Sequence, residues 1–112
     1  MTLILAQQSR GCVRDITIQD TDGETITPGA NDKIRAIITR IGETAQLTVT
    51  SDAATANGSS FTKGATNRLR LDASDLAEIE PGTYSLLVDY FDRADNSEWK
   101  TVERECIVIE GT

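Results

Sequence analysis

The sequence contains no histidine and only two cysteines, Cys12 and Cys106, among its 112 residues. A zinc site needs about four nitrogen, sulfur or oxygen ligands, usually from close Cys or His pairs, so no metal or cofactor site is predicted. Nucleophilic catalysis would lack a histidine base, and no nucleophile-elbow pattern or cleft between paired carboxylates is indicated. The sequence therefore predicts a protein that is not an enzyme and has no catalytic residues.

The two cysteines leave two alternatives open. They are either free, buried thiols or the two halves of a disulfide. Closing so long a loop would stabilise the fold by about 4 to 5 kcal/mol in the chain-entropy model. A reducing cytosol disfavours that bond.

The chain also lacks a long apolar segment and an excess of basic residues. Its apolar start, MTLILA, is short and has no basic residue before it, so neither a secretory signal nor a transmembrane span is predicted. The formal net charge of −7 opposes binding to nucleic acid and to an anionic membrane surface. Neither is predicted as a partner.

The charge is unevenly distributed along the chain. Residues 1–71 carry 8 basic and 7 acidic side chains, whereas residues 72–112 carry 3 basic and 11 acidic ones. Strands from both halves of the chain can interleave in the fold. The charge asymmetry would then only make one sheet or one sheet edge more acidic than the rest. Alternatively, an acidic surface meets basic side chains of a neighbouring subunit.

What the sequence does contain is a series of short β-branched and aliphatic runs separated by turn signals. This pattern is typical of an all-β sandwich. Residues 1–10 are expected to form an N-terminal arm or an edge strand. The predicted strands cover residues 2–8, 13–19, 33–41, 45–51 and 67–72.

The middle of the chain breaks this pattern. Residues 51–67 are almost all small or polar, which predicts a long exposed loop with at most a short strand around Phe61. A short helical turn is predicted over residues 74–79. Asp72 or Ser74 would be its N-cap, and the following Pro-Gly pair would stop it.

The last two apolar runs predict a hairpin around residues 92–97. Placing Tyr90 opposite Trp99 and Asp89 opposite Lys100 pairs aromatic with aromatic and acid with base. Each such pair favours the register by a few tenths to about 1 kcal/mol.

Farther from the loop this register places Leu87 opposite Val102 but Leu86 opposite Glu103, which is unfavourable. A β-bulge near Glu103 to Glu105 would resolve the conflict. Burial of both faces of the last strand would resolve it as well.

The stretch EIEPGTYSLLV resembles the E-F corner of immunoglobulin-like and fibronectin type III-like sandwiches, where a Tyr hydroxyl bonds back to upstream backbone. Pro81, Gly82 and Tyr84 would form that corner. The resemblance implies an immunoglobulin-like antiparallel β-sandwich of about 7 to 9 strands. Residues 1–112 would then form a single domain.

The whole layout, with GETITPGANDKIRAIIT early and LRLDASDLAEIEPGTYSLLVDY late, resembles small β-sandwich proteins of tailed-phage virions. Those modules decorate or cement capsids, or lie in tails and baseplates. The resemblance implies a noncatalytic virion structural protein that binds and stabilises a capsid or tail lattice. It would be made in the bacterial host cytoplasm and would form a homo-oligomer, with trimers favoured on capsids.

Interface candidates are apolar residues of the N-terminal arm, the 51–67 loop and the outer face of the last hairpin. They are Leu3, Leu5, Phe61, Leu87, Phe91, Val102 and Val108.

The rival interpretation is an immunoglobulin-like module that binds carbohydrate or a host surface. Its contacts would centre on Tyr90 and Trp99, because the chain has only five aromatic residues and sugars stack on exposed rings. A large exposed aromatic platform would favour this alternative over subunit contact.

Calcium is a weaker alternative for the acidic residues. Oxygen ligands could come from the hairpin tip, at Asp89, Asp92, Asp95 and Glu98. Solvated loop carboxylates are the simpler interpretation. The stretch DTDGE at residues 20–24 lacks the further ligands of a calcium loop and is interpreted as a turn.

Overall fold

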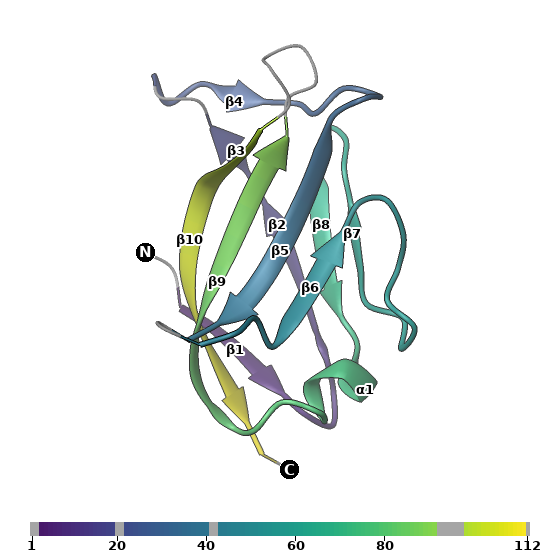
Figure 1. Cartoon of the computed structure of the whole chain (residues 1–112), viewed down its shortest axis with the longest axis vertical. Helices are drawn as coiled ribbons and strands as arrows, with labels where there is room; N and C mark the ends of the chain where they lie inside the picture. Colours follow the sequence, from purple (N-terminus) through teal and green to yellow (C-terminus); the bar gives the residue numbers. More distant parts are fainter. Residues whose placement is uncertain (1–2, 20–21, 41–42, 92–97, 112) are drawn as a thin grey trace.

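The computed structural model describes residues 3–19, 22–40, 43–91 and 98–111 (Figure 1). Within these residues the chain forms ten strands and one short helix. In chain order they are β1 (Leu3–Gln7), β2 (Cys12–Ile16), β3 (Ile18–Gln19), β4 (Thr25–Ile26), β5 (Lys33–Thr39), β6 (Leu47–Thr50), β7 (Ser60–Thr62), β8 (Asn67–Leu71), α1 (Ala73–Leu76), β9 (Gly82–Phe91) and β10 (Trp99–Glu110).

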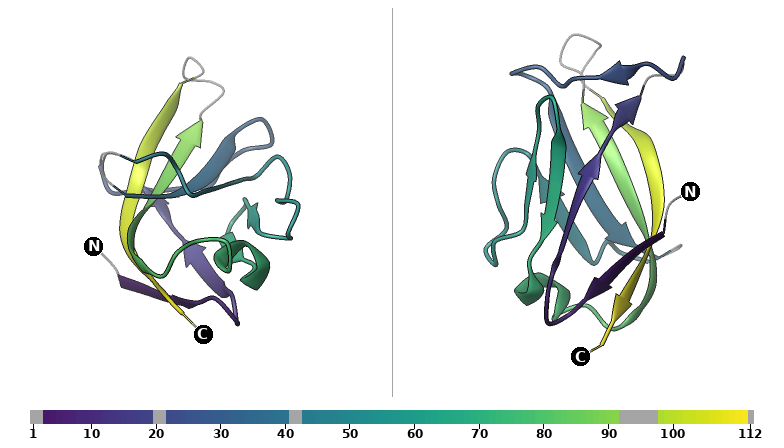
Figure 2. Two further views of the ribbon diagram at one scale, coloured as in Figure 1. Left: turned by 60° about the horizontal axis from the view of Figure 1, so that its bottom comes forward. Right: turned by 180° about the vertical axis from the view of Figure 1, so that it is seen from behind.

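The strands form two layers that pack face to face (Figure 2). A five-stranded sheet, in the order β1-β10-β9-β5-β6, is called the large sheet here. A three-stranded sheet, β2-β8-β7, is the small sheet, and β3 pairs separately with β4. The all-β class is thus confirmed. The strand number exceeds the expected 7 to 9 because the predicted strand 13–19 is divided into β2 and β3, and because β4, with two residues, is too short for periodicity to reveal.

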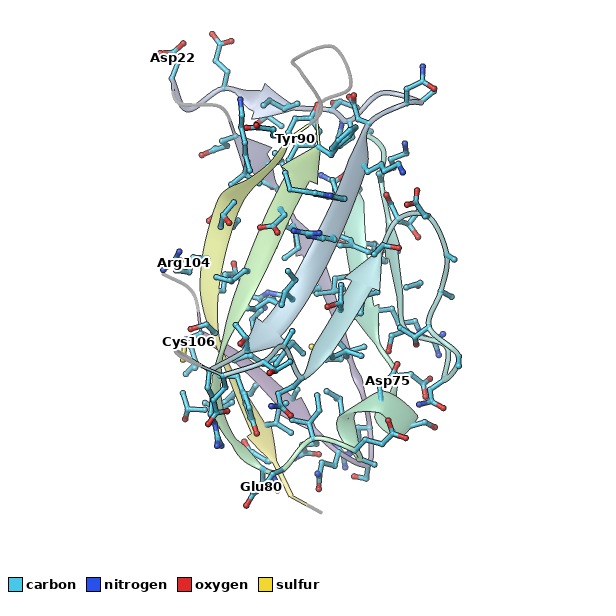
Figure 3. All side chains as sticks on the ribbon, viewed as in Figure 1. Asp22, Asp75, Glu80, Tyr90, Arg104 and Cys106 are labelled. Carbon is cyan, nitrogen blue, oxygen red and sulfur yellow. The ribbon has the colours of Figure 1, made fainter. Side chains whose placement is uncertain are left out.

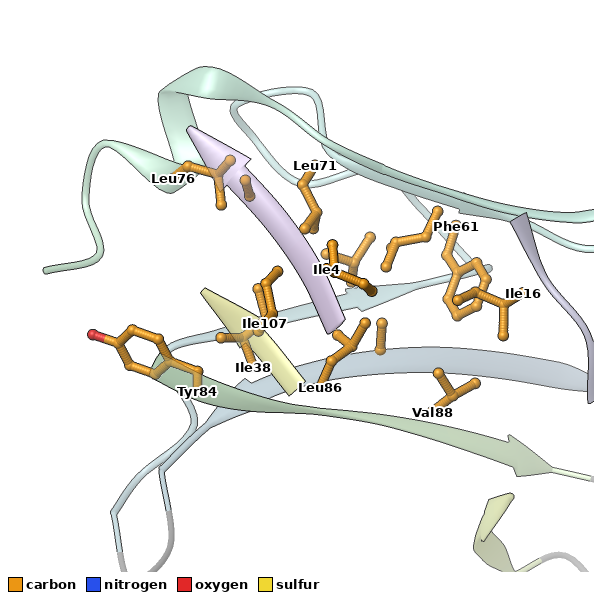
Figure 4. Close-up of a cluster of buried hydrophobic side chains, with 14 of the residues drawn as sticks. Ile4, Ile16, Ile38, Phe61, Leu71, Leu76, Tyr84, Leu86, Val88 and Ile107 are labelled. Carbon is orange, nitrogen blue, oxygen red and sulfur yellow. The ribbon is translucent and has the colours of Figure 1, made fainter. Parts of the chain in front are cut away.

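The core lies between the two sheets because alternate residues of each strand point inward. In β5 the inward residues are Ile34, Ala36 and Ile38, and Leu86 and Val88 of β9 lie beside them. The small sheet contributes inward side chains from β7 and β8 (Figure 4). One continuous apolar cluster therefore connects the layers.

The sheets are not purely antiparallel, which corrects the expectation. β1 runs parallel to β10, with Leu3 opposite Cys106, while the other strand pairs are antiparallel within the described residues. Parallel neighbours need a long crossover, and here almost the whole chain supplies it. After β1 the chain crosses to the small sheet through Gly11, whose φ is +75° and whose position leaves no room for a Cβ beside the Leu71 carbonyl.

The predicted register of the final hairpin was wrong by one residue. Trp99 lies opposite Phe91, not Tyr90, and Thr101 lies opposite Asp89. The prediction considered only two strands, whereas β9 is central and Asp89 pairs with an arginine of β5. The loop at residues 92–97 lies outside the described residues.

A β-bulge does interrupt β10, but between Thr101 and Glu103, slightly before the expected place. The extra residue, Val102, packs against the core. Beyond the bulge, Glu105 and Ile107 lie opposite the inward-facing Leu86 and Tyr84. The bulge thus reverses the phase of the strand, which explains why one register could not fit the whole hairpin.

The segment 51–67 is not an exposed loop throughout. Strand β7 is the short strand expected around Phe61, but Phe61 is buried opposite Leu69 in the core. Phe61 is one of three buried residues in this otherwise polar stretch, together with Ser59 and Asn67. The helical turn is also shorter than predicted, covers Ala73–Leu76, and is N-capped by the carboxylate of Asp72.

A buried carboxylate anchors the start of the same segment to α1. Asp75 accepts hydrogen bonds from Thr55 Oγ1 (2.6 Å), Asn57 Nδ2 (3.0 Å) and the Ser59 hydroxyl (Figure 3). Burial acts to raise the pKa of Asp75, but the hydrogen bonds from Ser59, Thr55 and Asn57 outweigh it, so that the pKa lies below its usual value.

Candidate binding surface

The cross-strand register brings apolar side chains together on the outer face of the large sheet. Directly opposed residues share a face, and those flanked by inward core residues point outward. Ile37 lies opposite Leu87, which lies opposite Arg104. In the adjoining rows Cys106 lies opposite Leu3, and Val108 lies opposite Leu5.

We call this surface the apolar outer face. It comprises Leu3, Leu5, Ile37, Leu87, Cys106 and Val108, with the neutral residues Thr39, Thr48, Thr83 and Ser85 among them. Leu5, on the edge strand β1, is 61% exposed, and its neighbour Leu3 is exposed as well. Charges lie at its margins, on Glu110 and on Arg104, which is labelled in Figure 3.

A polar and aromatic cluster adjoins the apolar outer face on the same side of the large sheet. Arg35 Nε lies 2.8 Å from Asp89 Oδ2, and Thr101 Oγ1 donates to Asp89 Oδ1 at 2.8 Å. The guanidinium carbon of Arg35 lies 4.2 Å from the centre of the Trp99 ring, which also packs against Phe91 with the ring centroids 5.5 Å apart. The cluster therefore uses both oxygens of a buried carboxylate and covers part of the Trp99 ring.

The structure sorts the predicted interface residues into two groups. Phe61 is buried in the core, and Val102 is turned inward by the bulge, so neither lies on the outer face. These two assignments are corrected. The others lie on the outer side of the large sheet, although they come from three different strands: Leu3, Leu5, Leu87, Phe91 and Val108.

The predicted glycan contacts do not form an exposed aromatic platform. Tyr90 is buried, and its hydroxyl donates to Asp32 Oδ2 at 2.9 Å. This corrects its assignment as a sugar contact. Trp99 is half-buried, with Arg35 against its ring.

Sequence reasoning missed Ile37 and Cys106 as members of the face. Each lies in a strand with alternating side chains. The alternation of one strand shows which of its residues share a face, but not which residues of other strands lie beside them on that face. The Arg35–Asp89 pair was missed because the residues are far apart in sequence and only the β5–β9 register joins them. No local signal could have identified that pair.

In the part of the chain that the structure describes, the cysteines and carboxylates show no arrangement suited to metal binding. Cys12 lies in β2 and Cys106 in β10, in different sheets, and both are free. Burial raises the pKa of the Cys12 thiol, with a smaller opposing effect from Arg14. Within the described residues, no group of three or more His, Cys, Asp or Glu could hold a metal ion. Two suggested calcium ligands, Asp92 and Asp95, lie outside these residues.

Neither a protein-family model nor a curated protein sequence matches this chain. In the part of the chain that the structure describes, no helix is long and apolar enough to span a membrane.

Proposed function

We propose that this protein is a noncatalytic binding module whose apolar outer face packs against a second copy of the chain. The observation that carries the proposal is the continuity of exposed Leu3 and Leu5 with Cys106, Val108 and Leu87 across three strands. Contiguous exposed apolar surface of this kind is typical of interaction sites.

Charge supports a second copy as the occupant. The protein carries a formal net charge of −7, so two copies repel each other over most of their surfaces. The apolar outer face places only neutral side chains at its centre, with Arg104 and Glu110 at its margins. Copies can therefore approach there with the least repulsion, and burial of leucine and valine side chains drives association.

We further propose that the fold is immunoglobulin-like. The sheet orders β1-β10-β9-β5-β6 and β2-β8-β7 support this proposal, because they match a two-sheet arrangement of the G, F and C strands against B, E and D. The hydrogen bond from Tyr84 Oη to the Glu80 carbonyl, 2.6 Å long, also supports it. In a tyrosine corner, the hydroxyl of a Tyr near the start of a strand donates in this way to the backbone a few residues upstream.

The biological setting that we propose is the virion of a tailed phage, where homo-oligomers, with trimers favoured, would bind a capsid or tail lattice. Support comes from the sequence resemblance and from an apolar surface through which copies of the chain can associate. Mass spectrometry of purified particles tests this setting. Absence of the protein from mature particles would overturn it.

Sedimentation equilibrium of three proteins tests the binding surface itself. Leu5 and Val13 are 61% and 59% exposed, lie on edge strands, and point from opposite sheets. Leu5→Glu is expected to weaken self-association by about tenfold or more, because burying one leucine contributes about 1.5 to 3 kcal/mol. Val13→Glu, the matched control, should associate like the wild type. A wild-type protein that stays monomeric, or equal effects of both substitutions, would refute the proposal.

The carbohydrate-binding alternative has less support. Tyr90 is buried and cannot contact a sugar, and the Arg35 guanidinium packs over the Trp99 ring. Retention of the protein on polysaccharide resins, lost in Trp99→Ala, would restore that alternative.

A further inference from the structure

We propose a second binding site, in which a groove between β2 and β10 accepts an extended, lysine- or arginine-bearing segment of a partner protein. This site is on a different side of the molecule from the apolar outer face and does not depend on it. The groove has a volume of about 500 Å³ and is lined by residues 13–17 together with Glu103 and Glu105. Most of its lining residues belong to β2 and β10, whose ribbons are seen from behind in Figure 2 (right) with β1 below them.

Two unpaired strand edges flank the groove. Among the described residues, β2 is the outermost strand of the small sheet and pairs only with β8, on its other side. β10 has β1 as its outer neighbour only from Cys106 onward, so within the described residues its first half has no strand beyond it. Backbone N–H and C=O groups along such edges can pair with an added strand. An extended segment lying in the groove would find these groups on both sides.

The charges in the groove indicate which side chain the segment must carry. After the bulge, Glu103 and Glu105 point toward the interior, opposite Val88 and Leu86. Glu105 Oε2 is buried and has no hydrogen-bond partner among the described residues. A buried carboxylate oxygen without a donor is costly, and a lysine or arginine side chain would supply the missing donor.

The other charged residues that line the groove do not neutralise Glu103 and Glu105. Asp15 is already bonded to Arg68, at 2.9 Å. Arg14 is the one basic residue among the lining residues, and none of the ion pairs between described residues joins it to Glu103 or Glu105. The groove therefore retains an excess of negative charge.

A partner protein fits this site better than a second copy does. Residues 72–112, which include Glu103 and Glu105, carry 11 acidic and only 3 basic side chains. A second copy would add to that negative charge, whereas a basic extended segment would complement it. The inferred occupant is thus a basic strand added to the edge of β10, with its cationic side chain beside Glu105.

A blocked peptide of alternating sequence, Thr-Val-Thr-Lys-Thr-Val-Thr, provides the probe. Titrated into ¹⁵N-labelled protein, it is expected to shift the amide signals of residues 13–17 and 99–105. Replacing its lysine by norleucine, or Glu105 by glutamine, should weaken binding by about tenfold, since a charge-assisted hydrogen bond is lost. Thermal melting of Glu105→Gln checks that the variant stays folded.

Backbone pairing is tested separately by methylating alternate amide nitrogens of the peptide. One of the two alternating patterns should abolish binding, because it removes the donors facing the strand edge. Shifts at the free edge of β6 instead, affinity indifferent to both methylation patterns, or no binding to the wild type would each overturn the proposal. Leu5→Glu should bind the peptide normally, which separates this site from the apolar outer face.

Discussion

The outer faces of the two sheets differ sharply in chemistry although both cover the same core. On the large sheet, Leu5, Val108 and Leu87 form an apolar surface. On the small sheet, Val13 lies opposite Arg70 and Asp15 lies opposite Arg68, so that charged side chains dominate. The charged outer face of the small sheet is therefore suited to contact with solvent, and the apolar outer face of the large sheet to contact with another protein surface.

Each face nevertheless carries one cross-strand arginine–aspartate pair, which permits a direct comparison. Arg35 Nε lies 2.8 Å from Asp89 Oδ2, and Arg68 Nε lies 2.9 Å from Asp15 Oδ1. The side chain of Asp89 is 7% exposed, whereas that of Asp15 is 57% exposed. The same bond is therefore expected to contribute differently to stability, since water and salt screen the exposed pair.

The largest expected effect tests this difference in burial. Asp89→Asn should lower the free energy of unfolding by about 2 to 3 kcal/mol, because Arg35 loses its anion while partly shielded from water. Asp15→Asn, the matched variant, should leave urea denaturation unchanged within error. Equal losses in both variants would show that burial does not separate the two faces.

A second prediction concerns the aromatic part of the large-sheet side. Trp99→Ala should cost about 1 to 2 kcal/mol in chemical denaturation, because the ring loses its contacts with Arg35 and Phe91. Trp99→Phe should recover part of this loss. Val13→Ala on the small-sheet face is the control and should have little effect, since Val13 is exposed.

A smaller, pH-dependent contribution to stability is expected from Asp75, which lies beyond the end of the small sheet. The pKa of Asp75 is lowered in the folded protein, so its contribution is complete above the unfolded value of about 3.9 and is lost as the pH falls through the folded value. The difference in Tm between wild type and Asp75→Asn should therefore be greatest near neutral pH and shrink in acid. A difference that grows in acid would contradict this assignment.

The smallest effect on stability is expected for the exposed pair Asp15–Arg68. The hydrogen bond from Arg68 lowers the pKa of Asp15, so NMR titration should place it below the ordinary value of about 3.9. In Arg68→Gln the pKa should return toward that value, and added salt should reduce the difference in the wild type. No accompanying change in Tm is expected. A measurable change would show that this exposed pair stabilises the fold.

Local patterns predicted the strands well where one face is buried. The predicted strand 33–41 contains β5, in which Ile34, Ala36 and Ile38 alternate strictly and form the inner side. The cap at Asp72 was also one of the two residues expected from helix chemistry. Prediction failed where two strands had to be aligned, because the bulge at Val102 changes which residues share a face.

The candidate surface was predicted only in part for the same reason. Leu3, Leu5 and Val108 were identified as apolar residues of terminal strands. Phe61 was misplaced because its polar surroundings concealed its alignment with Leu69. The groove was not foreseen at all, since it depends on where β1 ends along β10.

The sequence by itself determined the all-β class, because side-chain alternation with period two is a local property of the strands. It also determined the acidic character and the lack of histidine chemistry. Only the tertiary structure decided that Asp89 bonds Arg35, that Tyr90 is buried, and that Leu3 meets Cys106 from the opposite end of the chain. Those outcomes depend on sheet order and register, which arise when distant strands share one core.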